Sequence, residues 1–174
     1  MLNFNVKGIR GLTLITPTIY KDERGHNFES YDSLEFKKTV LKDDYLQTNF
    51  KDKDFVLDTF SKSKQNVFRG LHGDNKTWKL ISCLYGEIYL VVAQPSTKKW
   101  VEFYLDSKTR NQVLVPADCV NGHYCISHEC LFSYKMTEHY GGVESQYTVK
   151  WHDKKYNFNW PFDLTEAIIS SRDN

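Results

Sequence analysis

Val67-Phe68-Arg69-Gly70-Leu71-His72 is a short apolar stretch that carries an arginine and a histidine on a strand-like background. A polar segment, residues 61–66, precedes it, and a polar loop, residues 73–77, leads from it into the apolar run 78–93. The arginine suits phosphate binding because its planar guanidinium donates two parallel hydrogen bonds. The histidine suits proton transfer because its unperturbed pKa of about 6.5 lies near working pH. Taken alone, the stretch is more simply explained as a strand end with a solvated arginine and a structural histidine.

Short apolar runs separated by polar breaks recur on both sides of this stretch. Many short strands at such spacing favour an all-β antiparallel sandwich or barrel. The predicted strands are residues 55–60, 67–72, 78–83, 87–93, 100–105, 112–115, 122–126, 130–136 and 147–151.

The N-terminal third is more mixed. Residues 12–20 alternate as a half-buried strand does, with Pro17 indicating an edge or bulge, followed by a charged turn at 21–25 and extended structure over 27–31. Residues 32–40 form the best helix candidate, with Asp32 or Ser33 as its N-cap. Residues 42–54 are expected to form a loop, and the tail 163–174 a short helix or coil.

Composition limits the class of protein. A chain of 174 residues is long enough for one well-cored domain, spanning 1–174, and its net charge of +1 offers no global field to recruit nucleic acid or a membrane. It contains no apolar stretch of transmembrane length, and a signal peptide is not expected because residues 1–10 already mix polar and charged side chains. Its four cysteines form no close CxxC pair, which favours reduced thiols in a cytoplasmic protein over a zinc site or a disulfide framework.

Several short motifs follow one another along almost the whole chain, from about residue 11 to the end. They are Asp22-Glu23-Arg24-Gly25 with Glu29-Ser30, Arg69-Gly70-Leu71-His72, Lys79-Leu80, Gly86-Glu87, Lys99-Trp100-Val101, Val115-Pro116, Tyr134-Lys135, Lys150-Trp151 with Asp153, Asn159-Trp160-Pro161, and residues 168–173. In these motifs and their order the chain resembles the nucleotide-sugar 4-keto 3,5-epimerase family, of which dTDP-4-dehydrorhamnose 3,5-epimerase is the type.

The resemblance implies a cupin-like jelly roll with a few short helices, in a homodimer that exchanges N-terminal strands. It implies an isomerase that inverts C3, C5 or both in a nucleotide-diphosphate-linked 4-keto-6-deoxy sugar, for surface polysaccharide biosynthesis. The carbonyl acidifies the protons on both neighbouring carbons, so inversion needs a base, an acid on the opposite face and a group that stabilises the enolate. It requires neither a metal nor an organic cofactor.

The resemblance also implies roles for individual residues. His72 is the expected base, and Asp173 would fix its tautomer and stabilise the imidazolium. Tyr134 is the expected acid, and Lys79 would place an ammonium beside the developing oxyanion. The expected substrate-binding residues are Arg24, Glu29, Arg69, Asn121, Glu144 and Arg172.

The chain departs from the family pattern at several positions. Asn121 stands where the family usually has a second histidine, and an amide cannot carry a proton at neutral pH. His123 lies on the same strand face and is an alternative source of the imidazole. Asn27, Leu57 and Thr59 replace residues that bind thymidine in typical members. A guanine nucleotide carrying a hexose or heptose is therefore preferred over dTDP, and inversion at C3 alone remains open.

Two other functions fit the same residues. A 3,4-ketoisomerase of this fold would move the carbonyl instead of inverting a centre. A non-catalytic sugar-nucleotide-binding or scaffold protein would keep the fold without turnover, and Asn121 is the residue that favours it. A metal-dependent cupin needs several clustered histidine and carboxylate ligands, whereas Gly73 and Asp74 follow His72 without a second histidine nearby.

Overall fold

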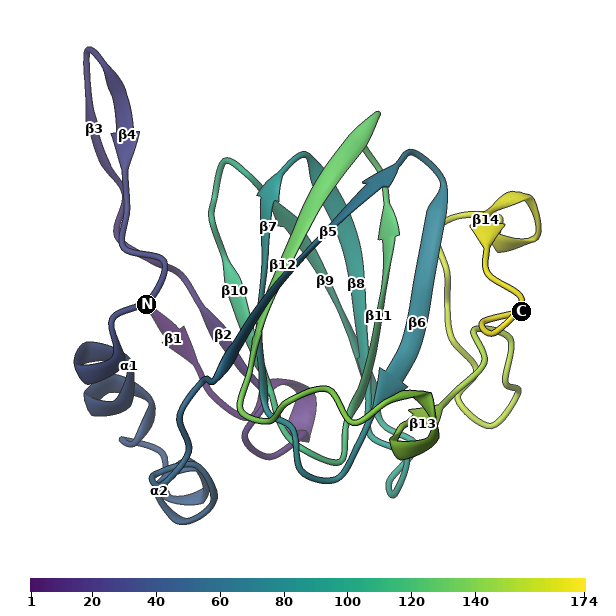
Figure 1. The fold of residues 1–174 in the computed structure, drawn as a ribbon, viewed down its shortest axis with the longest axis horizontal. Coiled ribbons are helices and arrows are strands. Elements are labelled where there is room, and N and C mark those ends of the chain that lie inside the picture. Colours follow the sequence, from purple (N-terminus) through teal and green to yellow (C-terminus); the bar gives the residue numbers. More distant parts are fainter.

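The computed structural model describes residues 1–174 and consists of two β-sheets that face each other as a flattened barrel (Figure 1). The first sheet contains, in spatial order, β1 (Leu2–Asn3), β2 (Thr13–Ile15), β10 (Gln112–Val115), β7 (Lys79–Tyr85), β12 (Glu129–Met136) and β5 (Leu57–Lys64). The second contains β13 (Tyr147–Thr148), β6 (Val67–Gly73), β11 (Val120–Cys125), β8 (Glu87–Ala93) and β9 (Trp100–Asp106). The predicted antiparallel sandwich or barrel is confirmed; the exception to antiparallel pairing is β14 (Ile168–Ile169), which runs parallel to β6.

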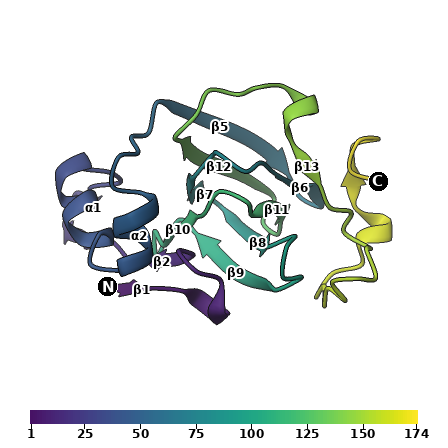
Figure 2. The same ribbon diagram turned by 90° about the horizontal axis from the view of Figure 1, so that it is seen from below.

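Three apolar clusters hold the layers together. The largest fills the space between the sheets and includes Ile81, Leu90 and Val113. A second, rich in aromatic residues, lies between the outer face of the second sheet and the C-terminal segment, and a third lies between the first sheet and the helices. Figure 2 shows the resulting order, with the helices on one side of the barrel and the C-terminal segment on the other.

The helices agree only in part with those predicted from the sequence. Helix α1 (Ser33–Val40) is confirmed, and the Asp32 side chain caps it by accepting from two backbone N–H groups. The prediction of a loop over 42–54 is wrong, because α2 (Asp44–Asn49) forms there with Asp43 as its cap. A single apolar turn that packs Leu46 and the following Phe50 against the sheet is enough to hold it. No helix is long and apolar enough to cross a membrane.

The predicted strand 12–20 is much shorter than expected. Only Thr13–Ile15 pairs with neighbouring strands, and the chain then leaves the sheet near Pro17, which has no N–H to donate. It re-forms as a hairpin of β3 (Tyr20–Asp22) and β4 (Gly25–Asn27), so the charged turn is smaller than residues 21–25. This hairpin stands away from the barrel (Figure 1).

The remaining predicted strands are all present. Strands 87–93 and 112–115 have the predicted bounds, the others have shifted ends, and two of these differ clearly in length. The polar segment 61–66 is largely strand, because β5 continues to Lys64 with alternating burial. The predicted strand 147–151 shrinks to the two residues of β13. Three 3₁₀ turns complete the chain: η1 (Val6–Gly8), η2 (Val143–Ser145) and η3 (Leu164–Glu166). The tail 163–174, predicted to be a short helix or coil, contains η3 but also the strand β14, which the prediction missed.

Candidate active site

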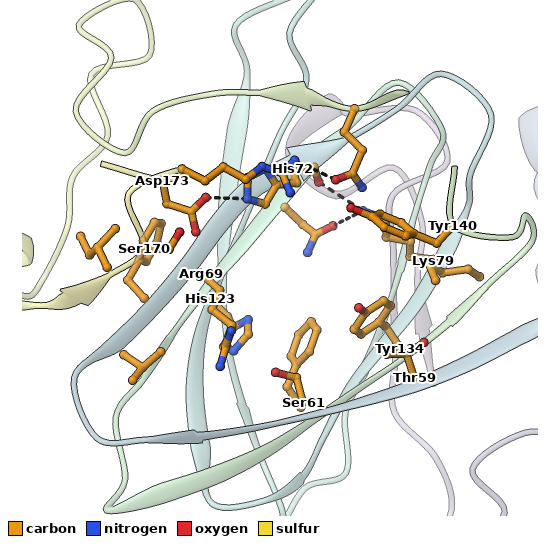
Figure 3. Close-up of a pocket in the computed structure, with 18 of the residues that line it drawn as sticks. Thr59, Ser61, Arg69, His72, Lys79, His123, Tyr134, Tyr140, Ser170 and Asp173 are labelled. Carbon is orange, nitrogen blue, oxygen red and sulfur yellow. Dashed lines mark hydrogen bonds and ion pairs between the residues drawn. The ribbon is translucent and has the colours of Figure 1, made fainter. Parts of the chain in front are cut away.

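A cavity of about 750 Å³ opens between the two sheets, within the size range of small-molecule sites. Its walls come from β5, β6, β7, β11 and β12, and the residues after β14 close one side. His72, Lys79, Asn121, Tyr134, Arg69, Arg172 and Asp173 all line it. Figure 3 shows most of these side chains surrounding one open space.

A bulge in β6 explains why both Arg69 and His72 reach this cavity. Residues three apart on a regular strand point to opposite faces. Here Asn121 pairs with His72 and His123 pairs with Arg69. The paired residues are three positions apart on β6 but only two apart on β11, so β6 contains one extra residue. Such a bulge re-aims side chains. Gly70 sits inside it at φ +132, and a Cβ there would overlap Gly122 Cα on the neighbouring strand, so the position requires glycine.

The bulge also binds the C-terminal tail. The Gly70 N–H donates to Asp173 Oδ2 at 3.2 Å, and Asp173 Oδ1 lies 2.7 Å from His72 Nε2. Burial pushes the pKa of Asp173 up, but the hydrogen bonds from His72 and Gly70 outweigh it and hold that pKa below the usual carboxyl value. An ionised Asp173 that accepts from Nε2–H leaves the lone pair of His72 on Nδ1, which lies 3.4 Å from Thr148 Oγ1.

The segment that carries Asp173 is held in place by several hydrogen bonds. The Lys150 ammonium donates to the carbonyl oxygens of Arg172, at 2.9 Å, and of Asn174. Arg172 Nη2 donates to Gln146 Oε1 at 2.9 Å. These contacts, with the pairing of β14 against β6, fix Asp173 beside a histidine about a hundred residues earlier in the chain.

Lys79 is a buried cation with uncharged partners. Its Nζ donates to Asn121 Oδ1 at 2.8 Å and to the His72 carbonyl oxygen at 3.1 Å. Burial lowers the pKa of Lys79 to about 8, although Asp74 partly opposes the shift. The amide of Asn121, where the family usually has a histidine, thus accepts from Lys79 and keeps its own N–H₂ group to donate.

Tyr134 projects from β12 into the same cavity, across the open space from His72 in Figure 3. Burial raises the pKa of its phenol, and Tyr140 adds to the shift, so the hydroxyl stays protonated at neutral pH. Arg69 also lines the cavity, and its Nε donates to Ser63 Oγ at 3.0 Å.

Three expected substrate-binding residues are not brought to the cavity within one chain. Arg24 lies at the tip of the projecting hairpin, where its ion-pair partner is Asp22. Glu29 follows the hairpin and lines a separate, smaller pocket near α1. Glu144 is exposed in η2.

Several cavity residues lie outside the predicted site. Tyr140, Gln146 and Ser170 line the cavity, and none stands in a pattern that distinguishes it from an ordinary loop residue. No group of three or more histidine, cysteine or carboxylate side chains is positioned to hold a metal ion.

Comparison with known proteins identifies the family. Residues 7–174 match the family model described as dTDP-4-dehydrorhamnose 3,5-epimerase. The chain belongs to this family. It is therefore an isomerase of the epimerase class.

Individual relatives agree with this assignment. The dTDP-4-dehydrorhamnose 3,5-epimerase of Salmonella typhimurium is 32% identical over 88% of this chain and 83% of its own length. The Legionella pneumophila enzyme RmlC, solved with dTDP-4-keto-L-rhamnose, superposes with a TM-score of 0.85 at 29% identity, covering 99% of this chain and 90% of its own. The Bacillus anthracis enzyme, solved with TDP and PPi, gives 0.81 at 28% identity, covering 99% of this chain and 97% of its own. The cupin-like jelly roll is confirmed by these structures.

Proposed function

We propose that this chain is a cofactor-independent epimerase that inverts C3, C5 or both in a nucleotide-linked 4-keto-6-deoxy sugar, with His72 as base and Tyr134 as acid. The observation that carries the proposal is that an imidazole paired to a carboxylate and a protonated phenol line opposite sides of one cavity, with a buried ammonium beside them. A base and an acid on opposite faces are what stereochemical inversion needs.

His72 is the base that removes the proton. Asp173 pairs with Nε2 and leaves the lone pair on Nδ1, which would exchange its contact with Thr148 Oγ1 for the proton of the carbon next to the ketone. The imidazolium that forms is stabilised by the same carboxylate, which lies at 2.7 Å and is ionised at neutral pH.

The electrons left on carbon move onto the ketone oxygen and form an enolate. The Lys79 ammonium and the free N–H₂ group of Asn121 are the donors for that oxygen. With a pKa of about 8, Lys79 carries its charge at neutral pH. Inside a cavity that excludes water, such a charge stabilises the oxyanion more strongly than in solution.

Tyr134 then protonates the same carbon from the other face, and the resulting phenolate recovers its proton from solvent or from His72. The elevated pKa of Tyr134 prevents earlier loss of this proton. Since an enolate is a stronger base than a phenolate, the transfer is downhill.

Arg69 and Arg172 are proposed to bind the diphosphate, because both guanidinium groups line the cavity. For the nucleotide we propose GDP in preference to dTDP. Leu57 and Thr59 line the cavity on β5 at positions where typical members bind thymidine, and a leucine side chain can form no hydrogen bond to a pyrimidine. A hexose or a heptose fits the proposal.

The enzyme is proposed to act as a homodimer that exchanges N-terminal strands. The β3–β4 hairpin stands off its own barrel and carries Arg24, whose ion pair is only with Asp22 two residues away. Docking of this hairpin at a partner's cavity would add Arg24 and Glu29 to the diphosphate and nucleotide site. Four buried, unpaired cysteines support a cytoplasmic location, where precursors of surface polysaccharides are made.

The decisive experiment is incubation with 4-keto-6-deoxy sugars linked to dTDP, GDP and CDP in deuterated water, followed by proton NMR. We expect deuterium at C3, C5 or both, fastest with a GDP sugar, and an inverted product. Movement of the carbonyl to C3 would identify a 3,4-ketoisomerase instead. Tight binding without any exchange would identify a binding or scaffold protein.

A further inference from the structure

His123 is a buried polar residue of the cavity that the reaction described above does not use. It projects from β11, is 3% exposed, and its Nε2 has no hydrogen-bond partner in the chain. Its ring is stacked on Phe132, with centroids 4.1 Å apart and planes inclined by 11°. A buried imidazole nitrogen without a partner is unfavourable for folding alone, which points to a ligand that supplies one.

The surroundings keep this imidazole neutral. Burial lowers the pKa of His123 to about 3, and the nearby Arg69 guanidinium contributes to the shift. A neutral imidazole has one N–H donor and one lone pair, and it cannot take up a proton at physiological pH. His123 therefore does not replace the family's second histidine as a proton carrier, but it suits an uncharged group that both donates and accepts.

The place of His123 along the barrel indicates which part of the substrate it meets. Asn121 and His123 are two residues apart on the same face of β11, a spacing of about 6–7 Å. Phe132 and Tyr134 repeat that spacing on β12. His123 and Phe132 thus form a second level of the cavity, one strand repeat away from the groups that surround the ketone.

We propose that His123 is a specificity-determining residue whose imidazole hydrogen-bonds a sugar hydroxyl lying about 6–7 Å from the ketone oxygen held by Lys79 and Asn121. This proposal rests on the proposed function, since it takes the sugar ring to lie beside Lys79. A hydroxyl can pair with either imidazole tautomer, whereas a methyl group or hydrogen at that place would leave Nε2 unpaired. Sugars without the hydroxyl are thereby rejected.

The test replaces His123 with Phe, which preserves the stacking on Phe132 but removes both nitrogens, and with Gln, which keeps a donor and an acceptor. His128→Gln, an exposed histidine on the β11–β12 turn, is the matched control. We expect His123→Phe to raise KM for the keto sugar about threefold to tenfold with kcat within about twofold and an unchanged pH profile. His123→Gln should lie between wild type and Phe.

Calorimetry shows whether His123 hydrogen-bonds the sugar or the nucleotide base. Binding of GDP or dTDP alone should be unaffected in His123→Phe, while binding of GDP-mannose or dTDP-glucose should weaken. An equal loss of affinity for the free nucleotides would mean that His123 contacts the base. An unchanged KM would mean that only a water molecule hydrogen-bonds His123 Nε2. A loss of kcat with a changed pH profile would mean proton transfer. Each of these three results would overturn the proposal.

The test depends neither on turnover by the wild type nor on folding of the variants. If wild type turns over no keto sugar, the proposed function fails, yet the calorimetric comparison still decides whether His123 binds sugar. If both variants fail to fold, ¹⁵N NMR of histidine-labelled wild type replaces them. The His123 ring nitrogens should shift with GDP-mannose or dTDP-glucose but not with GDP or dTDP; identical spectra in all states would refute the assignment.

Discussion

His72 and His123 line the same cavity from neighbouring strands, yet their surroundings differ in every respect that matters chemically. The His72 side chain is 19% exposed and has an ionised carboxylate 2.7 Å from Nε2. His123 is 3% exposed, stacks on a phenyl ring, lies near a guanidinium and has an unpaired Nε2. Position in a cavity therefore does not make a histidine a base; the carboxylate that stabilises its charged form does.

Removal of His72 should give the largest effect and sharpen this contrast. His72→Asn leaves no group able to take the proton, so we expect deuterium incorporation to fall about a thousandfold. His128→Asn serves as the control, and circular dichroism should show an unchanged fold for both. If His72→Asn exchanges at the wild-type rate, His72 is not the base and the distinction between the two histidines disappears.

Loss of the Lys79 charge should rank second. Lys79→Met should lower kcat by several hundredfold, because the enolate then forms without its ammonium. In wild type the rate should fall as pH rises through about 8, where Lys79 loses its proton. Lys76→Met, on the exposed loop before β7, should keep both the rate and this alkaline limb. A wild-type rate that stays flat to pH 10 would contradict the assigned role.

Asp173→Asn should have a smaller effect on rate, about a hundredfold, because His72 remains but loses its charge partner. The folded-state pKa of Asp173 is depressed, so its ionised form stabilises the protein above about pH 4 and this stability is lost as pH falls through the folded-state pKa. We expect the variant to unfold about 1–2 kcal/mol more easily than wild type at pH 7. The difference in free energy of unfolding between Asp173→Asn and wild type should narrow below pH 4. A difference that does not change with pH, as expected for an Asp52→Asn control, would argue against the His72–Asp173 pair.

The fold was largely predictable because its strands carry their own signals. Short apolar runs with polar breaks identify most of the barrel, and the Asp32 cap identifies α1. Helix α2 has no readable sequence period because its six residues make too few turns, although Asp43 caps it. The predicted strand 12–20 is too long because the alternation of apolar and polar residues does not show where the neighbouring strand ends.

The sequence predicts only part of the cavity lining and none of its geometry: Arg24, Glu29 and Glu144 were expected at the site but do not line the cavity. The motifs point to His72, Lys79, Tyr134 and Asp173, and these do line one cavity. The bulge that turns both Arg69 and His72 inward depends on a register shift against β11, which no local pattern encodes. The burial of His123 without a hydrogen-bond partner cannot be read from the sequence either, because Phe132, which covers its ring, comes from another strand.

We propose that His72 removes a proton on one face of the sugar and that Tyr134 donates its own proton on the other. Proton NMR of Tyr134→Phe in deuterated water tests this division of roles, because it reports deuterium incorporation and inversion in one sample; Tyr104→Phe on β9 is the control. We predict incorporation within about tenfold of wild type but at least about a hundredfold less inverted product. Equal loss of both, or inversion at the wild-type rate, would contradict it.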